Sequence, residues 1–363
     1  MGRLLKKAGI TGIAGLLAFM PAITGNTNIK AAKTRQAKKV YKYKQDKKQV
    51  KEFSSIKADA STLDIVIKKS GSKDFYISYN LNCNNSSNPV SYKIEDGVLS
   101  IKEQGLKWPV IPFYADKDGR KIYDRYYNKI YVYIPSGANI KNYNLDTGAG
   151  DLFIKNIAIN NSKITTESGD IDLNVPEISG SMDIKTESGD IDINTDRDTK
   201  ITTDINGQLN INTESGDVDI RKSAINKIFK IRTESGDLDI SKSAINKIFK
   251  IRTGSGDLKI FNSAIKGKLD VKTESGDADI WNLDISGNTD IQTSNGDVDI
   301  KMNSKYIDKI GINFVTKNGD MYIKKLYKGT KRKNGAGYEY TRNKNNKILF
   351  NVLVTGCGDI ELR

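Results

Sequence analysis

The feature that most constrains this chain is a phrase repeated along its second half. "TESGDIDL" occurs at 166–173 and "TESGDIDI" at 186–193, and close variants follow at 213–220 and 233–240. The Gly-Asp pair of this phrase recurs most often every 20 residues, and longer spacings indicate three insertions. Because a period of this length is typical of stacked repeats, the repeat unit rather than the chain length decides the architecture.

Apolar and polar residues alternate on both sides of each Gly. Ile231 lies five residues before Gly236, and Leu238 and Ile240 lie two and four residues after it. This is strand periodicity, but the parity changes at the Gly, so one straight strand cannot face a single core. We therefore expect a corner at Ser-Gly-Asp, with Gly236 at positive φ. A second turn is expected about 11 residues later in several units, at Gly180, Gly267 and Gly287.

Each unit thus reads as two short strands and two corners. One unit cannot bury its apolar face, whereas units stacked about 4.8 Å apart close a continuous core. The sequence therefore predicts an all-β, β-helix-like β-solenoid with coils of about 20 residues. An antiparallel meander is the alternative, although it would leave its apolar face open. Residues 222–233 and 242–253 are identical, which indicates a duplicated coil.

The N-terminus has the order of a secretory signal peptide. Arg3, Lys6 and Lys7 precede an apolar run at 8–23, and small residues follow. We expect cleavage after Ala31; an uncleaved anchor is the alternative, but the run is shorter than the roughly 20 residues that span a membrane. The remaining segments are predicted as a basic flexible leader (32–57), an N-terminal β-strand cap (58–144), solenoid repeats (145–325), a basic loop insertion (326–346) and a final coil (347–363).

Composition excludes several kinds of site. The chain has no His and only two Cys, so His-dependent triads, His-ligated metals and Cys-rich zinc sites are excluded. Cys83 and Cys357 lie about ten predicted layers apart, on the order of 40 Å. Because a disulfide needs Cα atoms within about 7 Å, we expect two thiols rather than a disulfide.

Charge is distributed unevenly along the chain. The net charge of +14 combines +12 over residues 1–57, +3 over 58–144, −10 over 145–300 and +9 over 301–363. An acidic middle between basic ends favours anionic cell-wall or membrane-surface polymers, including carbohydrate, as partners. A specific nucleic acid is disfavoured, because an exported protein meets envelope polyanions first.

The repeated carboxylates allow two interpretations. Stacked acidic turns bind calcium in some secreted repeat proteins, and like charges on neighbouring coils repel unless a cation relieves them. Alternatively, the Asp after each Gly holds its own corner by bonding nearby backbone N–H groups. No other cofactor is expected. The calcium candidates are Asp217, Asp219, Asp237 and Asp239.

Two irregular segments, 106–134 and 326–346, combine aromatic and basic residues. They could form a surface for sugars or anionic polymers, or the tyrosines could simply pack the cap while the basic segment stays solvated. The candidate surface residues are Trp108, Tyr123, Tyr126, Tyr127, Lys331, Arg332, Tyr338 and Tyr340.

Strands leading into "IPSGANIKNYNLDTGAGDL" at 134–152, followed by iterated Ser-Gly-Asp units, resemble the bacterial putative-adhesin family of β-strand-repeat proteins. The resemblance covers roughly residues 53–363. It implies a repetitive β fold, a cell-envelope setting and no assigned catalytic residues.

These observations favour an exported, non-enzymatic surface scaffold or binding module, secreted or held at the cell surface. A calcium-stabilised structural repeat protein is the alternative. A polysaccharide-active enzyme is less favoured, because catalytic carboxylates should interrupt a repeat pattern, whereas these follow it.

Overall fold

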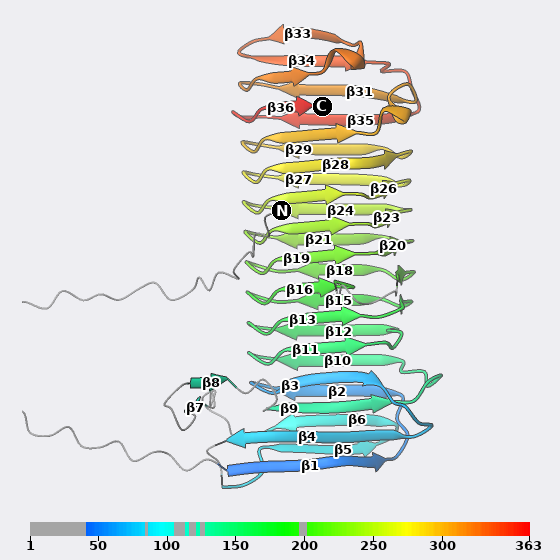
Figure 1. Ribbon diagram of the computed structural model, residues 1–363, viewed down its shortest axis with the longest axis vertical. Coiled ribbons are helices and arrows are strands. Elements are labelled where there is room, and N and C mark those ends of the chain that lie inside the picture. The colour runs from blue at the N-terminus through cyan, green and yellow to red at the C-terminus, as the bar shows by residue number, and fades with distance from the viewer. Residues whose placement is uncertain (1–40, 84–85, 105–112, 116–120, 124–127, 196–201) are drawn as a thin grey trace, which may run out of the picture. The chain divides into compact units, whose positions relative to one another are not determined.

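The structure is a computed structural model that describes residues 41–83, 86–104, 113–115, 121–123, 128–195 and 202–363. In these residues the chain is almost entirely β, and its coils stack along the long axis of Figure 1 with parallel strands in register. The predicted β-solenoid is therefore confirmed. The predicted signal peptide lies outside the described residues.

One side of the solenoid, the Asp face, is built from strands that follow the Ser-Gly-Asp corners. Its inner strands pair in parallel, while β1, β4 and β9 pair antiparallel at the N-terminal end. In spatial order the strands are β1 (Tyr41–Val50), β4 (Phe75–Cys83), β9 (Lys129–Ile134), β3 (Asp64–Lys69), β11 (Leu152–Lys155), β13 (Ile171–Asn174), β16 (Ile191–Ile193), β19 (Val218–Arg221), β22 (Leu238–Ser241), β25 (Leu258–Phe261), β28 (Ala278–Ile285), β30 (Val298–Met302), β36 (Ile360–Leu362) and β32 (Met321–Ile323).

A second side, the Thr face, is built from strands that lead into the corners. It ends in antiparallel pairs at both ends, β5 with β6 and β34 with β31 and β33. From the C-terminal end its strands are β33 (Thr330–Asn334), β34 (Gly337–Arg342), β31 (Ile310–Thr316), β35 (Ile348–Val354), β29 (Thr289–Thr293), β27 (Lys268–Thr273), β24 (Ile248–Thr253), β21 (Phe229–Thr233), β18 (Leu209–Asn212), β15 (Met182–Lys185), β12 (Asn161–Thr166), β10 (Asn142–Thr147), β2 (Ser55–Ala60), β6 (Val98–Glu103) and β5 (Val90–Glu95).

A third, short face joins the other two, so the prediction of two strands and two corners per coil is incomplete. Its strands are only two or three residues long, too short to show periodicity, and β28 supplies its last one. They are β14 (Glu177–Ile178), β17 (Thr203–Ile205), β20 (Ser223–Ile225), β23 (Ala244–Ile245) and β26 (Ala264–Ile265). Separate elements are the hairpin β7 (Phe113–Ala115) with β8 (Lys121–Tyr123) and the 3₁₀ turns η1 (Ser304–Tyr306) and η2 (Lys325–Tyr327).

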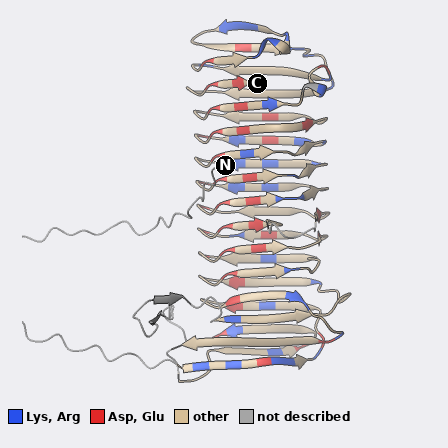
Figure 2. Ribbon diagram, in the orientation of Figure 1, with Lys and Arg blue, Asp and Glu red and all other residues tan. Residues whose placement is uncertain are grey.

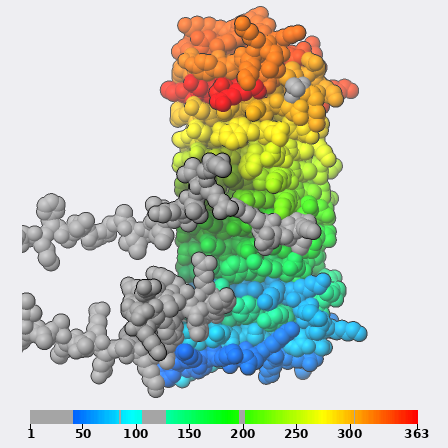
Figure 3. Space-filling model, in the orientation of Figure 1, coloured from blue at the N-terminus to red at the C-terminus, as the bar shows by residue number. Residues whose placement is uncertain are grey.

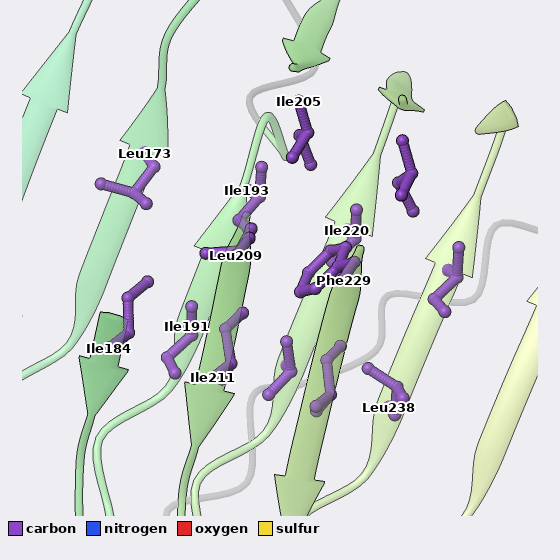
Figure 4. Packing of buried hydrophobic residues seen from close by; sticks show 14 of the residues in the cluster. Leu173, Ile184, Ile191, Ile193, Ile205, Leu209, Ile211, Ile220, Phe229 and Leu238 are labelled. Atoms are coloured by element: carbon purple, nitrogen blue, oxygen red, sulfur yellow. The ribbon is translucent and has the colours of Figure 1, made fainter. Parts of the chain in front are cut away.

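Inward-pointing columns of aliphatic side chains fill the core. Ile211, Ile231 and Ile251 stand in register on the Thr face, and all three are at most 1% exposed. Figure 4 shows how side chains from the faces meet between the sheets. Phe229 and Phe249, equivalent positions of the duplicated coil, stack with ring centroids 4.7 Å apart. This column packing is what the period-two pattern predicts.

The Gly of each corner is required for a different reason than expected. Gly236 is not among the glycines with positive φ, yet a Cβ on it would lie 2.0 Å from the carbonyl oxygen of Gly216 in the preceding coil. The corners therefore need Gly because neighbouring backbones approach closely. Positive φ occurs instead at the corner after the Asp face, at Asn156, Asn194, Lys222, Lys242, Asn262 and Asn282.

The N-terminal end differs from the predicted flexible leader. Within 32–57 the structure places all of β1 and the start of β2. β1 pairs antiparallel with β4 and is the end strand of the Asp face, and its Tyr41 and Tyr43 alternate with lysines as in other strands. The lysines that suggested a solvated leader are the outward half of this alternation.

The C-terminal coil is out of sequence order. β35 pairs in parallel with β29 on one side and with β31 on the other, so the last coil lies between two coils that precede it in the chain. Figure 3 shows its red band below the orange residues that precede it. The segment 326–346, predicted as a loop, forms η2 and the hairpin β33–β34 that covers β31.

In the described part of the chain, none of the helical segments has the length and hydropathy that a membrane span requires. Cys83 is buried in β4 and Cys357 is exposed before β36, and these two residues form no disulfide, as expected.

Candidate functional site

A ladder of aspartates runs along the Ser-Gly-Asp corners. The Oδ1 atom of Asp237 accepts a hydrogen bond from the backbone N–H of Asp257 in the next coil, at 2.8 Å. Ten such bonds link eleven residues, so the Asp secures the neighbouring coil rather than its own corner. In spatial order the ladder is Asp64, Asp151, Asp170, Asp190, Asp217, Asp237, Asp257, Asp277, Asp297, Asp359 and Asp320.

The Thr before each corner closes the turn itself. Thr233 is 3% exposed, and its Oγ1 accepts the backbone N–H of Gly236 at 2.9 Å. The same bond recurs at Thr186, Thr213, Thr273, Thr293 and Thr316. The Thr and Asp columns of the repeat are therefore accounted for by structure.

A second column of aspartates faces outward from the Asp face. Asp172, Asp192, Asp219 and Asp239 stand in register on successive coils, followed by Lys259. Burial, together with the neighbouring charges of Asp219 and Asp172, raises the pKa of Asp192 to about 6. Burial, with like-charge neighbours, also raises the pKa values of Asp239 and Asp279.

The four calcium candidates do lie together. Asp217, Asp219, Asp237 and Asp239 line a groove of about 180 Å³ with Asp257 and Lys259. Three of them are already engaged: Asp217 and Asp237 accept ladder hydrogen bonds and Asp219 is paired with Arg221, whereas Oδ1 of Asp239 is buried without a hydrogen-bond partner. Nowhere in the described residues do three or more Asp, Glu or Cys side chains converge as metal ligands would.

A wider groove of about 910 Å³ runs beside the corners on the Thr face. Arg232, Arg252 and Lys272 line it from successive coils, together with Glu234 and Glu274. Arg252 is held by Asp270 at 3.1 Å. Cations and carboxylates alternate here, so the groove has no single sign of charge.

Three predicted surface residues, Trp108, Tyr126 and Tyr127, lie outside the described residues. Tyr123 is the last residue of β8, and its backbone pairs with Phe113 of β7.

The other four predicted surface residues lie in one hairpin but differ in burial. Lys331 and Arg332 are exposed on β33, and the Lys331 Nζ atom lies 4.0 Å from the centroid of the Tyr338 ring. Tyr340, in contrast, is 2% exposed, and its hydroxyl donates to the carbonyl oxygen of Tyr327. Tyr340 is therefore a core residue and not part of a ligand surface.

A basic region that we call the C-terminal tip covers residues 321–334, from β32 through η2 to β33. A pocket of about 500 Å³ here is lined by Tyr322, by Lys324, Lys325 and Lys328 of the η2 region, and by Lys331. Tyr322 is 57% exposed and Leu326 is 50% exposed. The sequence interpretation did not name Tyr322, Leu326 or these three lysines, although "MYIKKLYKGTKRK" breaks the repeat where they occur.

The chain is similar to several solved structures. The chain is similar to a putative lipid binding protein from Parabacteroides distasonis (14% identity, TM-score 0.41, covering 88% of this chain and 96% of the other). It is also similar to a putative adhesin from Bacteroides fragilis (13% identity, TM-score 0.30, covering 90% and 98%). No curated protein matches the chain.

The Toastrack DUF4097 family matches residues 136–227 and 206–363, which together are more than half of the sequence and include the Ser-Gly-Asp repeats. The chain therefore belongs to the Toastrack DUF4097 family.

Proposed function

We propose that this protein is an exported, non-enzymatic scaffold of the cell envelope that binds anionic polymers through the basic strands at the ends of its solenoid. The observation that carries this proposal is the placement of charge. Figure 2 shows basic residues on both end strands, β1 and β33, while acidic residues mark the corners between them. Every residue of β33 is exposed, and the strand contains Lys331, Arg332 and Lys333.

The acidic middle supports a scaffold role. The corner carboxylates hold one coil to the next, and the outward Asp column follows the repeat, with Lys259 replacing one Asp, rather than gathering two carboxylates as a separate acid and base. A polyanion is therefore attracted to the ends and repelled by much of the side.

The export part of the proposal rests on the charged, apolar and small-residue order of residues 1–31. It is tested by N-terminal sequencing of protein extracted from the cell surface or medium. A chain that begins near Ala32 supports export with cleavage, whereas Met1 at the N-terminus contradicts cleavage.

The binding part is tested with the mature chain on immobilised polyanion and on isolated envelope fractions, eluted with a salt gradient. Retention should fall steeply with salt, because the Debye length shrinks from about 10 Å at 0.1 M to about 3 Å at 1 M. The variant K331E/R332E/K333E should elute at lower salt than the wild type.

The matched control is K227E/K230E/K250E, which makes the same charge change at three exposed lysines in the middle of the solenoid. Equal elution of the two variants would show that net charge alone governs retention and would contradict the assignment to the ends.

A further inference from the structure

Among the described residues, large exposed apolar side chains are rare, and the two most exposed of them lie close together in the chain. In the described part of the chain only Ile228, Trp281, Tyr322 and Leu326 are large, apolar and exposed. Two of the four, Tyr322 and Leu326, lie within five residues of each other in the C-terminal tip and are the most exposed, at 57% and 50%.

The tip stands at the open end of the Asp face. Among the described strands β32 pairs with β36 alone, whereas the Thr face continues past β31 into β34 and β33. The pocket of about 500 Å³ lies beside β32, where the Asp face has no further strand. The chain then turns through η2, and Lys328 follows with a left-handed backbone at φ 42°. Tyr322 and Leu326 are thus presented at an end of the solenoid.

The surroundings of these two side chains are strongly basic. Residues 321–334 contain five lysines, one arginine and no acidic residue. Lys324, Lys325 and Lys328 are exposed, and the Lys331 Nζ atom donates to the carbonyl oxygen of Met321. Acids close to the tip have partners: Glu361 pairs with Arg363 at 2.7 Å, Asp320 accepts a bond from the Tyr322 hydroxyl at 3.4 Å, and Asp359 accepts the backbone N–H of Asp320.

We propose that the C-terminal tip docks on an anionic lipid bilayer, with Tyr322 and Leu326 entering the headgroup region and the surrounding lysines contacting lipid phosphates. Stable attachment to a membrane surface takes two signals, apolar insertion and attraction to anionic lipid, and the tip supplies both. This inference rests on the proposed function and names one partner for it.

Two other occupants fit the tip less well. A soluble anionic polymer needs only the cations and gives no role to an exposed Leu. A second copy stacked head to tail would bring β1, with Lys42, Lys44, Lys47 and Lys48, against a tip of the same charge. A lipid surface is the occupant that uses both the charge and the apolar side chains.

The test is co-sedimentation of the mature chain with phosphatidylcholine vesicles prepared with and without phosphatidylglycerol. We expect binding only to the vesicles that contain phosphatidylglycerol. Y322S/L326S should weaken this binding by about fivefold or more, because the apolar signal is lost. The matched control I228S/W281S, which changes the other two exposed apolar residues, should bind as the wild type does.

A charge variant, K324E/K325E/K328E, should abolish sedimentation, while K227E/K230E/K250E should retain most of it. Each variant is first compared with the wild type by circular dichroism and thermal melting. Equal binding by Y322S/L326S and the wild type would overturn the inference and leave only electrostatic attraction.

The same proteins are then run on the polyanion column. Retention there without any vesicle binding would overturn lipid docking and leave the proposed function standing, whereas loss of both in the wild type would reject the proposed function as well. Y322S/L326S should elute with the wild type, because these two side chains carry no charge.

Discussion

The carboxylate of Asp237 and the backbone N–H of Asp257 are joined across two coils by a hydrogen bond of 2.8 Å. The two residues are 20 positions apart in sequence, and the bond repeats at the same corner along the stack. Because Oδ1 caps a backbone group that points out of the neighbouring coil, the ladder fixes the register of each coil on the next.

Removing one rung should lower stability without changing the fold. We expect Asp237→Ala to lower the free energy of unfolding by about 1 kcal/mol, because the backbone N–H of Asp257 then has only water as its hydrogen-bond partner. Asp237→Asn keeps an Oδ1 acceptor and should cost less. Urea denaturation of both variants measures the difference; equal losses would mean that charge rather than hydrogen bonding matters at this position.

Because the backbones of neighbouring corners approach closely, adding even a methyl group at a corner Gly should lower the stability of the fold. Gly236→Ala would place its Cβ 2.0 Å from the Gly216 carbonyl oxygen, so the coils must separate, at a cost of about 2 kcal/mol or more. Gly71→Ala is the control, because its Cβ would have no atom within 4 Å. If thermal melting shows the two variants to be equally stable, close packing at the corner is not the reason for the Gly.

The stacked rings of Phe229 and Phe249 should contribute a large part of the packing free energy in this part of the core. Both side chains are fully buried, so Phe249→Ala should cost about 3–5 kcal/mol through lost burial and a cavity. Phe249→Leu retains most of the volume and should cost much less. The measurement is the free energy of unfolding in urea. A loss of less than about 1 kcal/mol for Phe249→Ala would contradict tight packing at this position.

The outward Asp column predicts that acid stabilises this part of the solenoid. The pKa of Asp192 is raised to about 6 in the folded chain, above the unfolded value near 4, so the folded state holds the proton more tightly. This contribution is fully present below about pH 4 and is lost as the pH rises through about 6. Asp192→Asn should therefore raise the melting temperature at pH 7 and reduce its change between pH 4.5 and 7.

A control for this effect is Asp59→Asn, the same substitution at an exposed residue of β2 that pairs in register with Lys102. Comparing the two variants separates the effect of the outward Asp column from that of removing one carboxylate elsewhere. If Asp192→Asn leaves the pH dependence of stability as it is in the wild type, other groups are responsible for that dependence.

The inserted last coil predicts that damage to β35 affects residues on both sides of it. Val352 is 1% exposed between β29 and β31, so Val352→Asp buries a charge between two coils and should expose the segment 310–342 to protease. Lys347→Asp, at an exposed residue just before β35, should have no such effect. Mass spectrometry of the digest should show intact coils before β27; uniform digestion would instead mean that the solenoid unfolds as one unit.

The sequence by itself determined the solenoid, its coil length and its core columns. These features depend on local information. The alternation of apolar and polar residues and the turn in each coil are both visible within 20 residues, as with Ile231 and Leu238 on either side of Gly236. The sequence also indicated that the insertion containing Lys331 and Tyr338 is basic, although it predicted a loop there rather than a hairpin.

Only the tertiary structure decided the rest, because it depends on contacts between residues far apart in the chain. Asn351 pairs with Asp290, 61 residues away, and this insertion of the last coil leaves β32 as the final strand of the Asp face. That position exposes Tyr322, whereas Tyr340, equally aromatic in sequence, is turned into the core by the pairing of β34 with β31. Which side chain meets water is set by the neighbouring coil, and a single coil's sequence does not contain that neighbour.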